Sequence, residues 1–273
     1  MKPETTTDPD RDPHASCPSF EDDSEPALAA LPRPDETPPA KNRRLEEERQ
    51  PVRITAAHVT LEGNLEIPEG AVGIVLFAHG SGSGRRSPRN RYVAHILRQG
   101  GLGTLLIDLL TPEEEMIDMQ TAHLRFDIPL LAERLMGATD WLIQHSSTQH
   151  LRIGYFGAST GSGAALMAAA ERPDVVKAVV SRGGRPDLAG PALARVRAPV
   201  LLIVGGEDFP VIELNREAMT KLAGDKKLEI IPGATHLFEE PGTLEEVSQL
   251  ARGWFQRYLQ EDRDRTNAGR SKV

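Results

Sequence analysis

The chain has little of what extracellular and membrane proteins usually contain. It has one cysteine in 273 residues, Cys17, which excludes an internal disulfide and a cysteine-based metal site. Its apolar runs stay well below the roughly 20 residues that a membrane-spanning helix needs. The N-terminus also lacks the basic-then-apolar layout of a secretory signal. We therefore predict a soluble, cytoplasmic protein without membrane contact.

A clustered basic surface is missing as well. Asp and Glu number 40 against 32 Lys and Arg, and the formal net charge is −8, so we expect no nucleic-acid partner. Residues 1–50 hold nine of the 21 prolines and an acidic excess. Such a segment cannot bury enough apolar surface to offset the entropy of ordering. The sequence predicts a disordered, acidic, proline-rich tail over 1–50, a folded domain over 51–260 and a flexible tail over 261–273.

From Pro51 onward, short apolar runs alternate with longer amphipathic stretches. Near-continuous apolar runs are typical of parallel strands that helices cover on both faces. The expected strands are 73–78, 103–109, 153–156, 175–180, 200–204 and 227–231. The expected helices are 89–99, 128–145, 161–171, 211–222 and 244–259. This alternation predicts an α/β fold, a doubly wound and mostly parallel sheet, which opens with an antiparallel hairpin over 52–67 that turns at Glu62-Gly63-Asn64.

A Gly-x-Ser-x-Gly pentapeptide, Gly157–Gly161, stands between an expected strand and an Ala-rich expected helix. In a doubly wound sheet, ligands bind beyond the carboxyl ends of the strands, which is where this pentapeptide falls. The pattern is typical of a nucleophile elbow, whose glycine positions have no room for side chains. Ser159 is therefore a candidate nucleophile, and the N–H of Thr160 is a candidate oxyanion donor. The alternative is a glycine-flanked turn that only packs a helix on a strand.

A glycine-rich loop, His79–Gly84, follows the first apolar run. Its backbone N–H groups, that of Ser81 above all, are candidates for the second oxyanion donor. A phosphate-cradling loop is the alternative, but no Gly-Lys-Ser/Thr follows, and the spacing departs from the dinucleotide fingerprint. We therefore favour the oxyanion role.

An acid and a histidine follow the last two expected strands. Asp208 comes after 200–204 and His236 after 227–231. A serine hydroxyl needs a base to take its proton, and a carboxylate holds the tautomer of a histidine base. This order predicts His236 as general base and Asp208 as its orienting acid, with Glu207 as the rival acid. Other histidines are expected to be structural or exposed: His58, His95, His123, His145 and His150.

At these positions the chain resembles the α/β-hydrolase superfamily and, within it, the dienelactone hydrolase-like branch. The resemblance covers about 52–259 and rests on four motifs in the family's order: His79-Gly80, Gly157–Gly161, Gly205–Asp208 and Gly233–His236. The segments 80–90 and 109–115 are also similar to a bacterial group of hydrolase domains that are sometimes fused to a phosphoribosyltransferase domain. We expect no such second domain in this sequence. Dienelactone hydrolases have cysteine at the elbow where this chain has serine, so the resemblance implies a general serine esterase.

Arginines are expected at the same edge of the sheet. Arg85 follows the glycine-rich loop, and Arg182 and Arg185 follow the strand 175–180. Because the planar guanidinium suits carboxylate or phosphate, these three arginines are candidates for binding an anionic substrate. The alternative is surface salt bridging to the acids at 113–115 or to Asp187.

Together these residues predict a serine hydrolase that cleaves a small carboxylic ester or lactone through an acyl-enzyme, without a metal or an organic cofactor. Two alternatives stay open: an amidase or peptidase with the same machinery, and a catalytically silent scaffold of this fold that acts as a binding protein. The expected partner is the small-molecule substrate. The pocket depends on loops such as Thr111–Arg125, and the sequence sets neither the substrate's identity nor the oligomeric state.

Overall fold

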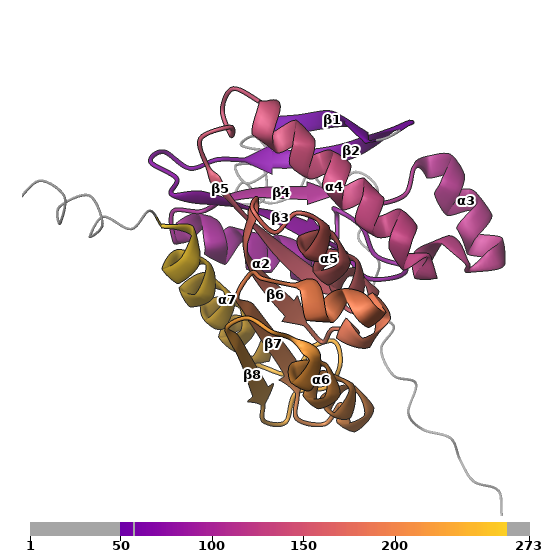
Figure 1. The fold of residues 1–273 in the computed structure, drawn as a ribbon, viewed down its shortest axis with the longest axis vertical. Coiled ribbons are helices and arrows are strands. Elements are labelled where there is room, and N and C mark those ends of the chain that lie inside the picture. Colours follow the sequence, from indigo (N-terminus) through magenta and orange to yellow (C-terminus); the bar gives the residue numbers. More distant parts are fainter. Residues whose placement is uncertain (1–49, 57, 261–273) are drawn as a thin grey trace, which may run out of the picture. The chain divides into compact units, whose positions relative to one another are not determined.

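The computed structural model describes residues 50–56 and 58–260, so both predicted tails, apart from Gln50, lie outside the described residues. One eight-stranded sheet has the order β1-β2-β4-β3-β5-β6-β7-β8 (Figure 1). The strands are β1 (Gln50–Ala56), β2 (Val59–Glu66), β3 (Gly73–Ala78), β4 (Gly103–Ile107), β5 (Arg152–Ala158), β6 (Val176–Arg182), β7 (Val200–Gly205) and β8 (Lys226–Ile231). The helices are α2 (Pro88–Gln99), α3 (Pro112–Thr121), α4 (Ile128–Gln144), α5 (Thr160–Glu171), α6 (Phe209–Lys221) and α7 (Thr243–Leu259), with 3-10 segments η1 (Leu124–Phe126) and η2 (Pro186–Arg195).

The sheet is mostly parallel, as the sequence predicts. The strands β3 to β8 run parallel to one another, whereas β1 pairs antiparallel with β2, and β2 pairs antiparallel with β4. The six parallel strands therefore end at one edge of the sheet. Every candidate residue that directly follows one of these strands lies at that edge, where ligands of doubly wound sheets bind.

The N-terminal hairpin forms, but the predicted position of its turn is wrong. β1 ends at Ala56 and β2 begins at Val59, so Gly63 lies inside β2, opposite Val52. A Cβ on Gly63 would stand 3.1 Å from Val52 Cγ2 and 3.2 Å from Ile107 Cγ2. This glycine therefore serves the close packing of side chains from the two neighbouring strands, not a change of direction.

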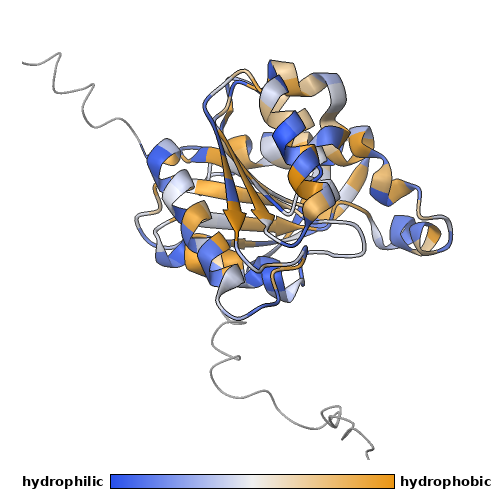
Figure 2. Ribbon diagram, turned by 90° about the horizontal axis from the view of Figure 1, so that it is seen from below, coloured by the Kyte–Doolittle hydropathy of each residue, from blue (hydrophilic) through white to orange (hydrophobic). Residues whose placement is uncertain are grey.

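Two apolar layers cover the sheet. The helices α4 and α5 and the segment η2 pack on one face, while α2 and α7 pack on the other (Figure 1). All six residues of β3 are buried, and they alternate between the layers: Ile74 and Leu76 contact the first, and Val75 and Phe77 the second. Figure 2 shows the same division, with apolar strands in the interior and many hydrophilic residues on the helices outside.

The expected loop over Thr111–Arg125 is instead the helix α3 followed by η1. The Thr111 hydroxyl accepts the Glu114 N–H at 3.2 Å, and the Glu114 carboxylate accepts the Thr111 N–H at 2.8 Å. Pro112 occupies the first turn. Such a capping box satisfies N–H groups that the start of a helix leaves free. The sequence Thr-Pro-Glu-Glu carries this signal, so the helix could have been predicted.

The other expected helices and parallel strands are confirmed, with bounds within two residues of the predicted ones. Burial explains this agreement, because each of these elements contributes side chains to one of the two apolar layers or to a small third cluster beside α6. Among the described residues, no helix is both long enough and apolar enough to cross a membrane.

Candidate active site

Ser159 stands between β5 and α5 in a strained backbone conformation. Its φ is 50° and its ψ is −123°, a combination that residues with side chains rarely adopt. Two backbone hydrogen bonds hold it there: its N–H donates to the Arg182 carbonyl at 3.2 Å, and its carbonyl accepts the Arg185 N–H at 3.0 Å. Strand, strained residue and helix together make the geometry of a nucleophile elbow.

Glycines provide the room that this turn needs. A Cβ on Gly157 would stand 2.5 Å from a backbone atom of α5, and a Cβ on Gly161 would stand 2.3 Å from the Ala78 carbonyl oxygen. A Cβ on Gly80 would stand 3.0 Å from the Cβ of Ser159. The predicted reason for the two elbow glycines is thus confirmed, and the glycine-rich loop lies directly against the serine.

Asp208 and His236 meet at the same edge of the sheet. The distance from Asp208 Oδ2 to His236 Nδ1 is 2.6 Å. The Asp208 side chain is 12% exposed and that of His236 38% exposed, so the carboxylate is shielded while the ring stays accessible. The rival acid, Glu207, is exposed and makes no ion pair with His236 among the described residues.

The end of β6 connects the histidine to the elbow. Gly183 follows the residue whose carbonyl accepts the Ser159 N–H, and it has a φ of 49°. A Cβ on Gly183 would stand 3.0 Å from the His236 carbonyl oxygen and 3.7 Å from His236 Cε1. The left-handed glycine therefore leaves room for the His236 backbone beside the end of β6, and the His236 ring lies close to the same position. Within the described part of the chain, the Ser159 hydroxyl and His236 share no hydrogen bond.

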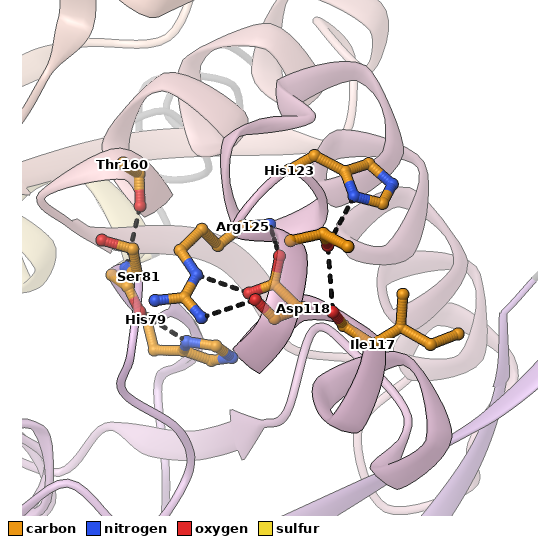
Figure 3. A network of polar contacts seen from close by, with 9 residues as sticks. His79, Ser81, Ile117, Asp118, His123, Arg125 and Thr160 are labelled. Carbon is orange, nitrogen blue, oxygen red and sulfur yellow. Dashed lines mark hydrogen bonds and ion pairs between the residues drawn. The ribbon is translucent and has the colours of Figure 1, made fainter.

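The glycine-rich loop is fixed at its first residue, His79, and at Ser81. His79 is buried, its Nδ1 donates to the Gly80 carbonyl at 2.9 Å, and its Nε2 accepts the Leu109 N–H at 2.9 Å. These partners require a neutral ring with the proton on Nδ1. Burial lowers the pKa of His79, which also favours the neutral ring. The Ser81 N–H donates to the Thr160 hydroxyl at 2.9 Å (Figure 3). The Ser81 N–H, one of the two predicted oxyanion donors, is thus bound to the side chain of the residue that carries the other.

A cavity of about 770 Å³ opens beside this loop. Its walls are the glycine-rich loop, the start of α2, α3 and Thr160. Ser159 does not line it, but Gly80 and Thr160 on either side of the serine do. Burial and the neighbouring charge of Asp108 raise the pKa of Glu115, which faces this space. The apolar part of the lining consists of Leu110, Met116, Met119 and Leu131.

The wall that α3 forms is held by two ion pairs. Arg125 Nε lies 2.5 Å from Asp118 Oδ2 at the C-terminal end of the helix (Figure 3). Near its N-terminal end, Arg134 Nη2 of α4 lies 2.8 Å from Glu114 Oε1. These residues are not among the predicted site residues, because a loop was expected over this segment. The role of His79 in fixing the glycine-rich loop was not predicted either.

Two of the three arginines expected to bind an anion are paired with acids. Arg185 Nη2 lies 2.7 Å from Asp187 Oδ2, the salt bridge that the alternative interpretation predicts. Arg85 forms ion pairs with Asp108 and with Glu62, at 2.5 Å to Glu62 Oε2, rather than with the acids of α3.

Arg182 differs from both. Its side chain is buried, with Cζ 5.9 Å from the centroid of the Phe238 ring, and it makes no ion pair with any described residue. It is also absent from the lining of the cavity. That Arg85, Arg182 or Arg185 binds a substrate stays a prediction.

These features define the class of protein. A mostly parallel sheet covered on both faces, a serine elbow after β5 and an aspartate–histidine pair at the same edge are the architecture of an α/β hydrolase. A model of the dienelactone hydrolase family matches residues 108–260. The chain belongs to the dienelactone hydrolase family.

Similar proteins agree with this assignment. The crystal structure of a dienelactone hydrolase from Anabaena variabilis is 66% identical, with a TM-score of 0.76, over 78% of this chain and 100% of that chain. Est1E from Butyrivibrio proteoclasticus shares the fold, with a TM-score of 0.62 at 17% identity over 76% of this chain and 98% of that chain.

Two Mycobacterium tuberculosis proteins, from strains CDC 1551 and H37Rv, are 58% identical over 204 residues. Both are provisionally named phosphoribosyl transferases. The matched segment is 75% of this chain and 45% of each relative, so the chain spans about half the length of these relatives.

Proposed function

We propose that this chain is a serine hydrolase that cleaves a small carboxylic ester or lactone through an acyl-enzyme on Ser159. The observation that carries the proposal is the 2.6 Å contact between Asp208 and His236, at the edge of the sheet where the elbow serine stands. Membership of a hydrolase family supports it. The strained turn at Ser159 also supports it, because nucleophilic serines of this fold occupy such turns between a strand and a helix.

In the first half of the proposed reaction, Ser159 Oγ attacks the carbonyl carbon and its proton passes to His236 Nε2. Asp208 accepts the Nδ1–H, which keeps Nε2 free as the acceptor and stabilises the imidazolium. The tetrahedral oxyanion accepts hydrogen bonds from the N–H groups of Thr160 and Ser81. The bond between the carbonyl carbon and the alcohol oxygen then breaks, and the alcohol takes the proton from His236.

In the second half, a water molecule gives a proton to His236 and attacks the acyl carbon, and the bond to Oγ breaks as Ser159 regains its proton. Two contacts change along this route. Ser159 and His236 come within hydrogen-bond reach in the substrate complex. The Ser81 N–H exchanges its bond to the Thr160 hydroxyl for one to the oxyanion.

The cavity beside Thr160 supports a small and largely neutral substrate. Its volume of about 770 Å³ is in the range of small-molecule sites, roughly 300 to 1,000 Å³. Three of the four arginines of its lining, Arg85, Arg89 and Arg125, are already paired with acids. The transferase name of the mycobacterial relatives belongs to proteins of which the matched segment is 45%, so we do not transfer that activity to this chain.

The test is reaction with a fluorophosphonate probe, which labels activated serines, followed by peptide mapping. We expect the label on Ser159, and we expect Ser159→Ala to remove labelling and to lower hydrolysis of p-nitrophenyl acetate by at least about 10³-fold. The matched control is Ser162→Ala, which removes a hydroxyl of the same helix that has no hydrogen-bond partner. It should keep both properties. Labelling of the native chain at a different serine would contradict the proposal, and comparison with the matching anilide tests the amidase alternative.

A further inference from the structure

Unpartnered polar atoms gather at the active-site end of the layer between the sheet and α2 with α7. Among the described residues, Arg89 Nε, Asn90 Oδ1, Arg182 Nε and Arg182 Nη1 are buried and have no hydrogen-bond partner. Buried polar groups in folded proteins are almost always hydrogen-bonded, and a buried charge without a partner is costly. These four atoms therefore indicate a hydrogen-bond partner that is not part of the chain.

The three residues share one end of one layer. Arg182 is the last residue of β6 and, by alternation, faces the same side as Ala178 and Val180, which belong to the core under α2 and α7. Asn90 precedes Ala94 of that core by one turn of α2. The helix α2 begins where the chain returns from the carboxyl end of β3, and β6 ends at this same edge because it runs parallel to β3 through β5. Arg89 and Asn90 therefore lie at the end of the layer where Arg182 lies.

Arg182 brings a positive charge into this place, and no carboxylate of the described residues pairs with it. Arg182 is 7% exposed, and its guanidinium lies over the ring of Phe238, two residues after His236. Burial and repulsion by Arg89 lower the pKa of Arg182 to about 10, so the group keeps its proton at neutral pH. Arg89 has a carboxylate of its own, with Glu239 Oε1 2.9 Å from its Nη1. One buried positive charge is left without a counter-ion.

We propose that Arg182, Arg89 and Asn90 form a binding site for a small inorganic anion of about the size of chloride. The anion accepts N–H bonds from Nε and Nη1 of Arg182 and from Nε of Arg89. The Asn90 amide, turned over, adds its Nδ2, because the oxygen and nitrogen of an amide are assigned from their partners. A charged group of a substrate is the alternative occupant, because Arg89 lines the cavity beside Thr160, whereas Arg182 and Asn90 do not.

Thermal unfolding of the full chain tests this site without any use of enzyme activity, so the result is independent of the proposed function. The protein is first brought into HEPES buffer without chloride, and chloride is then added at constant ionic strength. We expect Tm to rise saturably, by about 5 °C when chloride reaches 100 times its Kd. Crystals soaked in bromide should show an anomalous peak between Arg182 and Arg89.

The decisive variant is Arg182→Met, which keeps an unbranched side chain and removes its charge and donors. It should lose the chloride response, whereas Arg172→Met, a change at an arginine that is paired with Asp140, should keep it. A Tm of the native chain that is equal in HEPES and in chloride overturns the proposal, and so does a chloride response that survives Arg182→Met. A response to acetate but not to chloride overturns it in favour of a carboxylate subsite. If Arg182→Met does not fold, the bromide measurement on the native chain decides, and absence of the peak refutes the site.

Discussion

Replacing Asp208 with asparagine perturbs the central contact of the candidate site with the smallest change of shape. The carboxylate accepts the Nδ1–H of His236 at 2.6 Å, which leaves Nε2 as a proton acceptor. An asparagine that presents its amide nitrogen to the ring donates instead, so Nδ1 must accept and the ring proton moves to Nε2. The ring can then no longer take the proton of Ser159.

We expect Asp208→Asn to lower kcat by about 10⁴-fold, the cost of the wrong histidine tautomer in a serine triad. At 1.36 kcal/mol for each factor of ten, this is about 5.4 kcal/mol of activation free energy. KM should change little, because the lost interaction acts in the transition state. The variant should fold, since Asp208 precedes α6 without a side-chain cap bond that asparagine would break.

Steady-state hydrolysis of p-nitrophenyl acetate measures the effect, and the rate of fluorophosphonate labelling provides a second readout on the same variant. The control is Glu207→Gln, the same chemical change at the adjoining exposed acid, which should keep full activity. If Glu207→Gln loses activity and Asp208→Asn retains it, the assignment of the orienting acid is refuted.

Two further predictions concern folding. Gly161→Ala would place a Cβ 2.3 Å from the Ala78 carbonyl oxygen and 2.4 Å from that of His79, so the free energy of unfolding should fall by about 3 kcal/mol in urea titrations. Gly253→Ala, where a Cβ meets nothing within 4 Å, should raise it by about 0.5 to 1 kcal/mol, and equal effects of the two changes would contradict the packing argument. Burial lowers the pKa of His79 from its ordinary 6.5, so the unfolded chain binds more protons below that pH, and stability should be lost as pH falls from 7 toward 5. His79→Gln should reduce this loss, and an unchanged pH dependence in the variant would show that His79 does not cause it.

The fold could be predicted because the parallel strands β3 to β7 are buried on both faces, which leaves near-continuous apolar runs in the sequence. In β3, for example, all six residues are buried. In a parallel sheet, residues that directly follow different strands also lie at the same edge of the sheet. Ser159, Asp208 and His236 each follow a strand of the parallel set, and those strands end at one edge. The pairing of Asp208 with His236 could therefore be predicted from the sequence.

Contacts that depend on strand register could not be predicted in this way. Gly63 has the neighbours of a turn residue, yet its role depends on Ile107 of β4, more than 40 residues further on. For Arg85 the sequence offers an anionic substrate or, as the alternative, the acids at 113–115, but Arg85 pairs with Asp108 and with Glu62 of β2. Composition and spacing do not set which side chains such a register brings together.

The arginines divide the site into two regions with different electrostatics. Beside the cavity, Arg85, Arg89 and Arg125 are paired with acids, which suits a neutral ester. Behind the elbow, the buried charge of Arg182 has no acid to pair with among the described residues, and one small anion would balance it. If both proposals hold, chloride acts on the stability of the chain and leaves KM for a neutral ester unchanged. A substrate that used Arg182 would instead compete with chloride, and its KM would rise with the concentration of the salt.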